Sequence, residues 1–331
     1  MKPSRRNHNR MLTGAVIGIS VIGILYFGYR AVSENSKAIN ENPFEYNYDT
    51  FKKIDPALLK YSEISRISLD MQKVSGIAVA SDYTMYVTGD ETVVIMDADG
   101  HVLSSVKTGE TAHCLDVDFN GDMYCAMNDH IEVYDREGNQ KARWESPGEG
   151  ALTASIAVSE EHVYLADAGN RIVWKYDKSG NVVSRIGERD EDKDIPGFIV
   201  PSPYFDVDID PDGFLWVVNP GRHTLENYTP EGDLRSSWGE FSMDIDGFCG
   251  CCNPTHITIM EDGNFVTSEK GIPRVKVYNG PGALESVVAG PDLFAEGTQG
   301  LDLASDSMGR IYVLDPVKKA VMIFERNIPG V

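Results

Sequence analysis

A pattern of four short strands recurs six times along this chain, and it restricts the possible folds more than any other feature. The copies begin at residues 76, 114, 155, 206, 256 and 300, so successive starts lie 38 to 51 residues apart. Turns such as DADG, DREG and DKSG separate the last two strands of a copy, and Gly supplies the positive φ that these turns need. Apolar and polar residues alternate within the strands, as in IAVA and LDVD. Four-stranded repeats of about 40–50 residues are typical of propeller blades.

Six copies predict an all-β fold, a six-bladed β-propeller over residues 61–327. The sixth copy ends before a fourth strand, whereas a strand-like stretch, YSEISRISLD at residues 61–70, precedes the first copy. We expect this stretch to complete the sixth blade. The ring then closes by pairing the beginning of the domain with its end, which leaves no open edge between the first and last blades.

Three motifs of the repeat resemble a known family. GIAV, YLADAGNRIVWKYDKSGNVVSRIG and GRIYVLD resemble the repeats of the NHL six-bladed β-propellers, and the resemblance covers residues 61–327. It is to the membrane-anchored bacterial type, here with a Cys-x-Cys-Cys loop, a distant relative of the peptidyl-α-hydroxyglycine amidating lyase propellers. The resemblance implies the fold but leaves the function open, because such propellers include lyases, lactonases and pure binding proteins.

The N-terminus predicts one transmembrane helix before the propeller. Residues 11–29 carry no charge, and nineteen helical residues span about 28 Å, close to the thickness of a bilayer core. Basic residues precede this stretch, so the positive-inside bias predicts a signal anchor with the N-terminus inside. A cleaved signal peptide is the alternative, with a small-residue site at residues 31–33. The predicted parts are a cytoplasmic basic tail (1–10), the transmembrane anchor (11–30), a linker (31–60), the propeller (61–327) and a short tail (328–331).

The charge balance restricts the partners. The chain has 30 Lys and Arg residues against 51 Asp and Glu residues, a net charge of −21, which excludes a nucleic-acid-binding function. Because the N-terminal segment predicts an inside N-terminus, we expect the propeller on the extracytoplasmic, periplasmic side of the cell membrane. Its expected partners are the membrane, through residues 11–30, and other extracytoplasmic proteins or a membrane complex.

The stretch FCGCCNPTH, residues 248–256, holds three of the five cysteines. In the family that the chain resembles, the connection between two blades carries a Phe, then a Pro, then a Gly that opens the next inner strand. Here the cysteines stand between Phe248 and Pro254, and His256 takes the place of the Gly. The resemblance therefore implies that this loop lies at the mouth of the central channel.

The corresponding positions in the other copies suggest a site at that mouth. They are Gly76, Cys114, Ser155, Asp206 and Gly300. Thiolates, imidazoles and carboxylates are the common ligands of zinc, and four thiolates can hold an iron–sulfur cluster. We expect a cofactor held by Cys249, Cys251, Cys252 and Cys114, either an iron–sulfur cluster or a divalent metal such as zinc. The full set of expected metal ligands is Cys249, Cys251, Cys252, Cys114, His256 and Asp206.

Other interpretations of the cysteines stay open. An exported chain normally oxidises its thiols, so disulfides can brace the loop. A thiol–disulfide redox site and purely structural thiols are further alternatives, and Cys125, in the middle of a strand, is expected to be a buried structural thiol.

Three functions follow from these interpretations. The first is a propeller that binds a metal or iron–sulfur centre and acts as a binding or electron-transfer subunit. The second is a divalent-metal lyase or hydrolase of the amidating-lyase type that uses His256 and Asp206. The third is a disulfide-braced propeller that binds a protein or another ligand.

Overall fold

The computed structural model describes residues 22, 26, 29–30, 48–191 and 196–327. The chain divides into two units, Met1–Tyr48 and Asp49–Val331, and the second contains the propeller. Among the described residues, no helix is long and apolar enough to cross a membrane. The expected basic tail, most of the expected anchor and linker, and the C-terminal tail lie outside the described residues, so these parts remain predictions.

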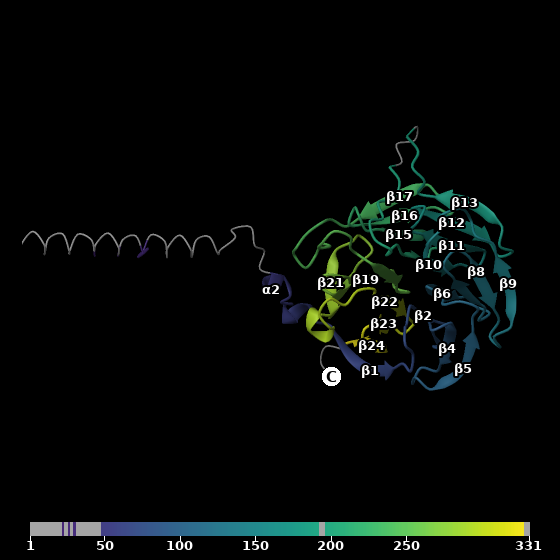
Figure 1. Ribbon diagram of the computed structural model, residues 1–331, viewed down its shortest axis with the longest axis horizontal. Helices are drawn as coiled ribbons and strands as arrows, with labels where there is room; N and C mark the ends of the chain where they lie inside the picture. Colours follow the sequence, from purple (N-terminus) through teal and green to yellow (C-terminus); the bar gives the residue numbers. More distant parts are fainter. Residues whose placement is uncertain (1–21, 23–25, 27–28, 31–47, 192–195, 328–331) are drawn as a thin grey trace, which may run out of the picture. The chain divides into compact units, whose positions relative to one another are not determined.

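The propeller consists of six four-stranded antiparallel sheets set around a central channel (Figure 1). Blades 1 to 3 are consecutive in sequence, and the innermost strand comes first in each. Blade 1 contains β2 (Gly76–Val79), β3 (Met85–Gly89), β4 (Thr92–Met96) and β5 (Val102–Lys107); blade 2 contains β6 (Cys114–Val117), β7 (Met123–Ala126), β8 (Ile131–Tyr134) and β9 (Gln140–Trp144); blade 3 contains β10 (Thr153–Val158), β11 (His162–Asp167), β12 (Ile172–Asp177) and β13 (Val182–Ile186).

The other blades repeat this order. Blade 4 contains β14 (Val207–Ile209), β15 (Leu215–Asn219), β16 (Thr224–Tyr228) and β17 (Leu234–Trp238); blade 5 contains β18 (His256–Ile259), β19 (Phe265–Glu269), β20 (Arg274–Tyr278) and β21 (Leu284–Ala289); blade 6 contains β22 (Asp302–Ser305), β23 (Ile311–Asp315), β24 (Ala320–Arg326) and β1 (Tyr61–Ser68). Short helices α2 (Tyr48–Phe51), η1 (Pro56–Leu58) and η2 (Pro291–Leu293) lie outside the sheets.

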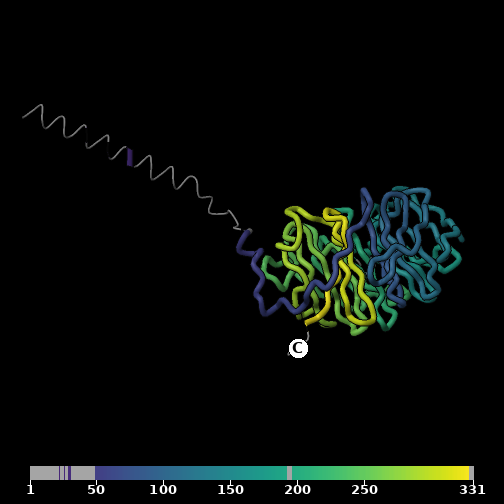
Figure 2. Tube along the Cα trace, turned by 90° about the horizontal axis from the view of Figure 1, so that it is seen from below, coloured from purple at the N-terminus to yellow at the C-terminus, as the bar shows by residue number. Residues whose placement is uncertain are grey.

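The predicted closure of the ring is confirmed. β1 pairs antiparallel with β24, from Tyr61 opposite Arg326 to Ser68 opposite Ala320. Figure 2 shows this N-terminal strand running beside the C-terminal strands. The hydroxyl of Ser62 also donates a hydrogen bond to Asn327 Oδ1 at 2.6 Å. The six-bladed, all-β architecture expected from the repeat is therefore correct.

Apolar side chains fill the spaces between neighbouring blades. Phe198, Phe248 and Phe294 belong to three different inter-blade clusters, and each is at least 93% buried. Phe248, for example, packs against Trp238 and Tyr278 with ring centroids 6.2 and 5.5 Å apart. Full burial of a Phe side chain stabilises a fold by roughly 1.5–3 kcal/mol.

The pairing register identifies the residue of each blade that first faces the channel. In blades 1, 3 and 5 this residue lies opposite the penultimate residue of the second strand, as His256 lies opposite Ser268. In blade 6 the equivalent residue is Asp302, opposite Leu314. The expected position, Gly300, was wrong by two residues, because Gly300 has φ +68° and lies in the irregular segment before the strand.

Candidate functional site at the channel mouth

Six equivalent residues, one at or just before the start of the channel-facing part of each inner strand, form what we call the mouth ring: Gly76, Cys114, Ser155, Asp206, His256 and Asp302. All except Gly76 line a cavity of about 360 Å³, together with His113 and Tyr204. The structure thus brings Cys114, Asp206 and His256 to one mouth, as the repeat indicates. Their roles as metal ligands stay predictions.

Side chains two residues further along each inner strand point the same way, because strand side chains alternate with period two. This deeper ring consists of Ala78, Asp116, Ala157, Asp208, Thr258 and Ala304. Most of its members line a second cavity of about 210 Å³. Its two carboxylates and the two of the mouth ring make the channel strongly acidic.

The four channel carboxylates tie neighbouring blades together. Asp206 accepts a hydrogen bond from the Ile257 N–H at 2.6 Å, and Asp302 accepts one from the Ile77 N–H at 2.8 Å. In the deeper ring, Asp116 and Asp208 accept backbone N–H groups of blades 3 and 5 in the same way, each at 2.7 Å. The inner strands of adjacent blades are not paired with each other. These contacts therefore provide hydrogen bonds between blades that sheet pairing does not supply.

Burial gives these carboxylates unusual acidities. It raises the pKa of Asp206, Asp208 and Asp302 to about 7 and that of Asp116 to about 6, although backbone N–H groups oppose the shift. The charge of Asp302 raises the pKa of Asp206 further. The charge of the channel therefore changes near neutral pH.

His256 presents an imidazole that has no hydrogen-bond partner among the described residues. Its Nδ1 atom is buried and has no hydrogen-bond partner. Burial lowers the pKa of His256 to about 4, so the ring is neutral in the physiological range. The imidazole lines the mouth cavity, where a bound molecule would contact it.

Tyr204 forms one wall of the same cavity and was missed by the sequence analysis. It stands at the end of the long loop that enters blade 4, and its ring packs edge-on against His256. Two other neighbours of Tyr204 are Gly300 and Lys270. A Cβ added at Gly300 would lie 3.1 Å from the Tyr204 ring, and the Lys270 ammonium lies 4.9 Å from the ring centroid. A loop without periodicity offers no signal for such a placement.

The loop cysteines occupy a different place from Cys114. Cys249 and Cys252 are buried, Cys251 is exposed, and none of the three lines the mouth cavity. Over the part of the chain that the structure describes, all five cysteines are free thiols, and the four expected thiol ligands do not gather within 4.8 Å of one another. A four-thiolate shell is therefore not preformed in this arrangement.

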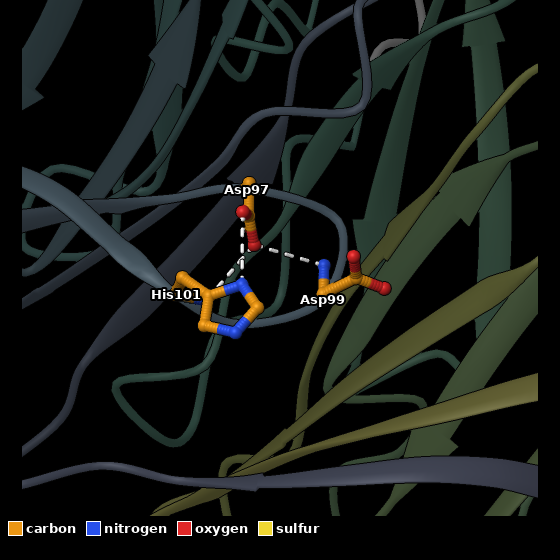
Figure 3. Close-up of side chains that lie close together, drawn as sticks. All are labelled: Asp97, Asp99 and His101. Atoms are coloured by element: carbon orange, nitrogen blue, oxygen red, sulfur yellow. Dashed lines mark hydrogen bonds and ion pairs between the residues drawn. The ribbon is translucent and has the colours of Figure 1, made fainter.

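One trio of potential ligands does gather, in the exposed turn between β4 and β5 (Figure 3). Asp97 Oδ1 accepts hydrogen bonds from the N–H groups of Asp99 and His101 at 3.0 and 2.8 Å, and Oδ2 contacts His101 Nδ1 at 3.0 Å. Asp135 and Asp177 hold the equivalent turns of blades 2 and 3 in the same way. The hydrogen bonds of Asp97 thus belong to a type of turn that recurs in the blades.

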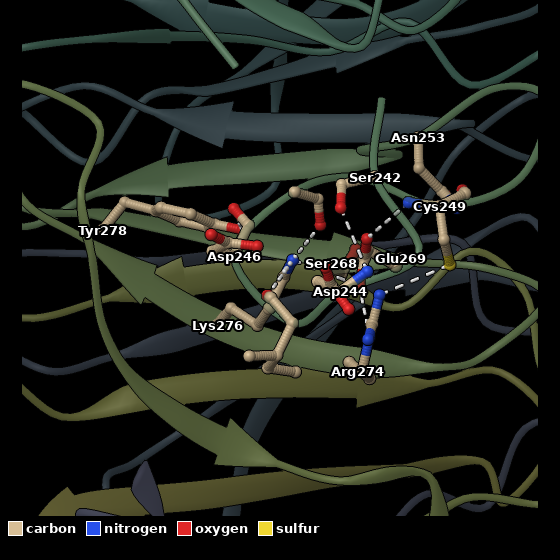
Figure 4. A network of polar contacts seen from close by, with 12 residues as sticks. Ser242, Asp244, Asp246, Cys249, Asn253, Ser268, Glu269, Arg274, Lys276 and Tyr278 are labelled. Carbon is tan, nitrogen blue, oxygen red and sulfur yellow. Dashed lines mark hydrogen bonds and ion pairs between the residues drawn. The ribbon is translucent and has the colours of Figure 1, made fainter. Parts of the chain in front are cut away.

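A buried polar network lies beneath the cysteine loop (Figure 4). Glu269 Oε2 accepts a hydrogen bond from Arg274 Nε at 2.6 Å and lies 3.4 Å from Lys276 Nζ, and all three side chains are fully buried. Arg274 also donates to Cys249 Sγ at 3.3 Å, and the Cys249 N–H donates to Glu269 Oε1. Burial raises the pKa of the Cys249 thiol, and the charge of Glu269 adds to this effect. Cys249 is therefore an anchor of the loop.

Comparisons with known proteins support the fold class. No family model matches the chain, so the NHL family remains a resemblance. Among solved structures, a streptogramin B lyase covers 82% of this chain and all of its own length, at 13% identity and a TM-score of 0.57. Virginiamycin B lyase from Staphylococcus aureus gives 12% identity and a TM-score of 0.57, with 81% of this chain and all of that chain covered.

A further solved structure is a protein of unknown function from Bacteroides thetaiotaomicron. It is 17% identical with a TM-score of 0.59, and the match covers 80% of this chain and 72% of that chain. At these identities the similarity shows the fold alone. The protein is a six-bladed β-propeller, and lyases are among its structural neighbours.

Proposed function

We propose that this protein is a membrane-anchored, extracytoplasmic propeller that binds a small polar molecule at its channel mouth and acts on it through His256. The neutral imidazole of His256, unpartnered and open to the mouth cavity, is the observation that carries this proposal. A neutral imidazole can accept a proton from a bound molecule, and with a pKa of about 4 His256 is a weaker base than an ordinary histidine.

The reaction class that best fits is a lyase reaction. A lyase removes a proton from one atom and releases a leaving group from its neighbour, so a positioned base is its minimal requirement. Two lyases are among the structural neighbours, and one neighbouring structure is a catalytically inactive histidine-to-alanine variant of virginiamycin B lyase with quinupristin. This supports a test of His256 as the base, without implying the same substrate.

The ligand is expected to be neutral or cationic and larger than a single ion. Asp206 and Asp302 face the cavity and repel anions once they ionise. The donor atoms of the mouth ring are spread around the channel, and no three of the described ones lie within 4.8 Å of one another. A molecule with several hydroxyl, amide or amine groups spans such a ring better than a bare cation does.

A metal or iron–sulfur centre stays a separate prediction. Cys114 and the loop cysteines would need to approach one another to bind it, whereas His256 and Asp206 already line the same cavity. Elemental analysis of the full chain, purified anaerobically, tests both arrangements. Loss of iron or zinc in Cys114→Ser identifies the first, and loss in His256→Ala with retention in Cys114→Ser identifies the second.

Turnover and binding test the main proposal. The full chain in detergent is screened against a library of polar small molecules, with quinupristin as one member, by thermal shift and product mass. Fragments whose masses sum to that of the substrate indicate elimination, and a gain of one water indicates hydrolysis. His256→Ala should abolish product formation, whereas His101→Ala, in an exposed turn, should match the wild type. Unchanged turnover in His256→Ala would overturn the proposal.

A further inference from the structure

Cys251 and Cys252 bring two sulfur atoms together at the surface of the cysteine loop. Their Sγ atoms lie 3.1 Å apart, closer than van der Waals contact, and both cysteines are free thiols. Cys251 is exposed, whereas Cys252 is only 2% exposed. One sulfur is therefore open to a partner, and the other lies directly behind it.

The residues on both sides of this pair are fixed. Asn253 Nδ2 donates to the carbonyls of Cys249 and Lys270, and Asn253 Oδ1 accepts the Lys270 N–H at 2.9 Å. Cys249 is held by Arg274 and Glu269 of the buried network, as Figure 4 shows. The short distance between the two sulfurs is thus a property of an anchored loop.

Two of the other cysteines offer no comparable group. Cys114 and Cys125 are both buried, so neither presents an exposed sulfur to a partner.

We propose that Cys251 and Cys252 form a redox-active dithiol. This dithiol exchanges with a disulfide bond, either of an extracytoplasmic protein or of an oxidised small-molecule thiol. The inference goes beyond the proposed function, because it involves neither His256 nor the mouth cavity. It rests on the contact between the two sulfurs, the exposure of one of them, and the anchoring of the loop.

The exchange proceeds in two steps. The Cys251 thiolate attacks one sulfur of the partner disulfide, which forms a mixed disulfide and releases one partner thiolate. The Cys252 thiolate then attacks the Cys251 sulfur, which forms the Cys251–Cys252 disulfide and releases the second partner thiolate. The pair loses two electrons and two protons, and the partner gains both as two thiols.

The disulfide ring formed by adjacent cysteines explains why the reaction would be reversible. A disulfide between adjacent residues closes a strained eight-membered ring, and strained, exposed disulfides are readily reduced. The oxidised pair therefore returns to the dithiol when the supply of disulfides falls. A permanent structural bridge would need a relaxed geometry.

A thiol titration tests the pairing. The reduced full chain is treated under native conditions with 5,5′-dithiobis(2-nitrobenzoate), and released thionitrobenzoate is counted. Wild type should release two equivalents and retain no adduct by intact mass, because Cys252 displaces the group from Cys251. Cys252→Ser should release one equivalent and retain the adduct, and Cys114→Ser should behave as the wild type. A stable adduct on wild type, or two equivalents from Cys252→Ser, overturns the proposal.

Reversibility is tested with mixtures of reduced and oxidised glutathione. After alkylation of free thiols, peptide mass mapping should show the Cys251–Cys252 link rising and falling with the glutathione ratio. Persistent glutathione adducts, or a dithiol at every ratio, would contradict an exchanging pair. His256→Ala should retain the response, so failure here is separable from failure of the proposed mouth function.

Discussion

The imidazole of His256 lies edge-on against the ring of Tyr204, with the two ring centroids 5.5 Å apart. The contact joins the loop that enters blade 4 to the inner strand of blade 5. Tyr204 therefore excludes water from one side of the imidazole and forms a wall of the cavity in which that imidazole lies. The low pKa of His256 and the shape of the mouth cavity both depend on this pair.

Removal of the Tyr204 ring should change the acidity of His256. Because burial is the cause of the low pKa, Tyr204→Ala should move the pKa of His256 from about 4 towards its ordinary value of 6.5. Tyr204→Phe keeps the edge-on contact and should leave the pKa low. Titration of the imidazole carbon protons by NMR measures both, and an equal shift in the two variants would contradict this role of the ring.

Stability should fall as pH rises through the acidic range. A carboxyl whose pKa is about 7 in the folded state and 3.8 otherwise binds its proton more tightly when folded. The stabilising effect of that proton is complete below pH 4 and is lost as pH rises towards 7. Asp208→Asn removes one titrating group, so its free energy of unfolding should vary less between pH 4 and 7 than that of the wild type.

Chemical denaturation across this pH range measures the slope. Asp208→Asn also loses one of two backbone hydrogen bonds, which costs roughly 1–3 kcal/mol at every pH. Only the slope is therefore diagnostic. Asp97→Asn, in the exposed turn of blade 1, serves as the control and should leave the wild-type slope between pH 4 and 7 in place. An unchanged slope in Asp208→Asn would show that this carboxyl does not titrate there.

Removing the negative charge of the buried network beneath the cysteine loop should destabilise the protein more than removing one of its positive charges. Glu269→Gln leaves two buried cations without a carboxylate and should cost about 3–5 kcal/mol. Lys276→Met removes the surplus cation, and burial already lowers the pKa of Lys276 to about 8, so its cost should be smaller. Urea denaturation ranks the two, and the opposite order would refute this charge balance.

The closing strand, β1, should contribute more to thermal stability than an ordinary outer strand does. Replacing residues 61–68 with Gly and Ser of equal length removes the partner of β24 and opens the ring. The same replacement of residues 102–107 removes β5, an outer strand that closes nothing. The first change should lower the thermal midpoint more than the second. Equal losses would indicate that closure adds no stability.

Much of the architecture can be predicted from the sequence, because turn chemistry and alternation repeat in every blade. The register of blade 6 could not be predicted, because glycines with positive φ stand at both Gly297 and Gly300 before the strand. Only the pairing of Asp302 with Leu314 shows where the strand begins. The repeat correctly brought Cys114 and His256 together. It could not indicate the path of the inserted cysteines, which depends on Asn253 and on a buried ion pair distant in sequence.

Ring closure also has a consequence for the time at which the protein can fold. Ser62 and its partner Asn327 are separated by 265 positions. The first strand of the propeller therefore cannot pair until the last strand has been synthesised. Contacts of such long range form slowly, and unpaired strand edges are prone to aggregation while they wait. A chain shortened at its C-terminus would keep five complete blades yet leave β1 without its neighbour. Its unpaired edge would distinguish an unfinished molecule from a finished one for any protease that degrades incompletely folded chains.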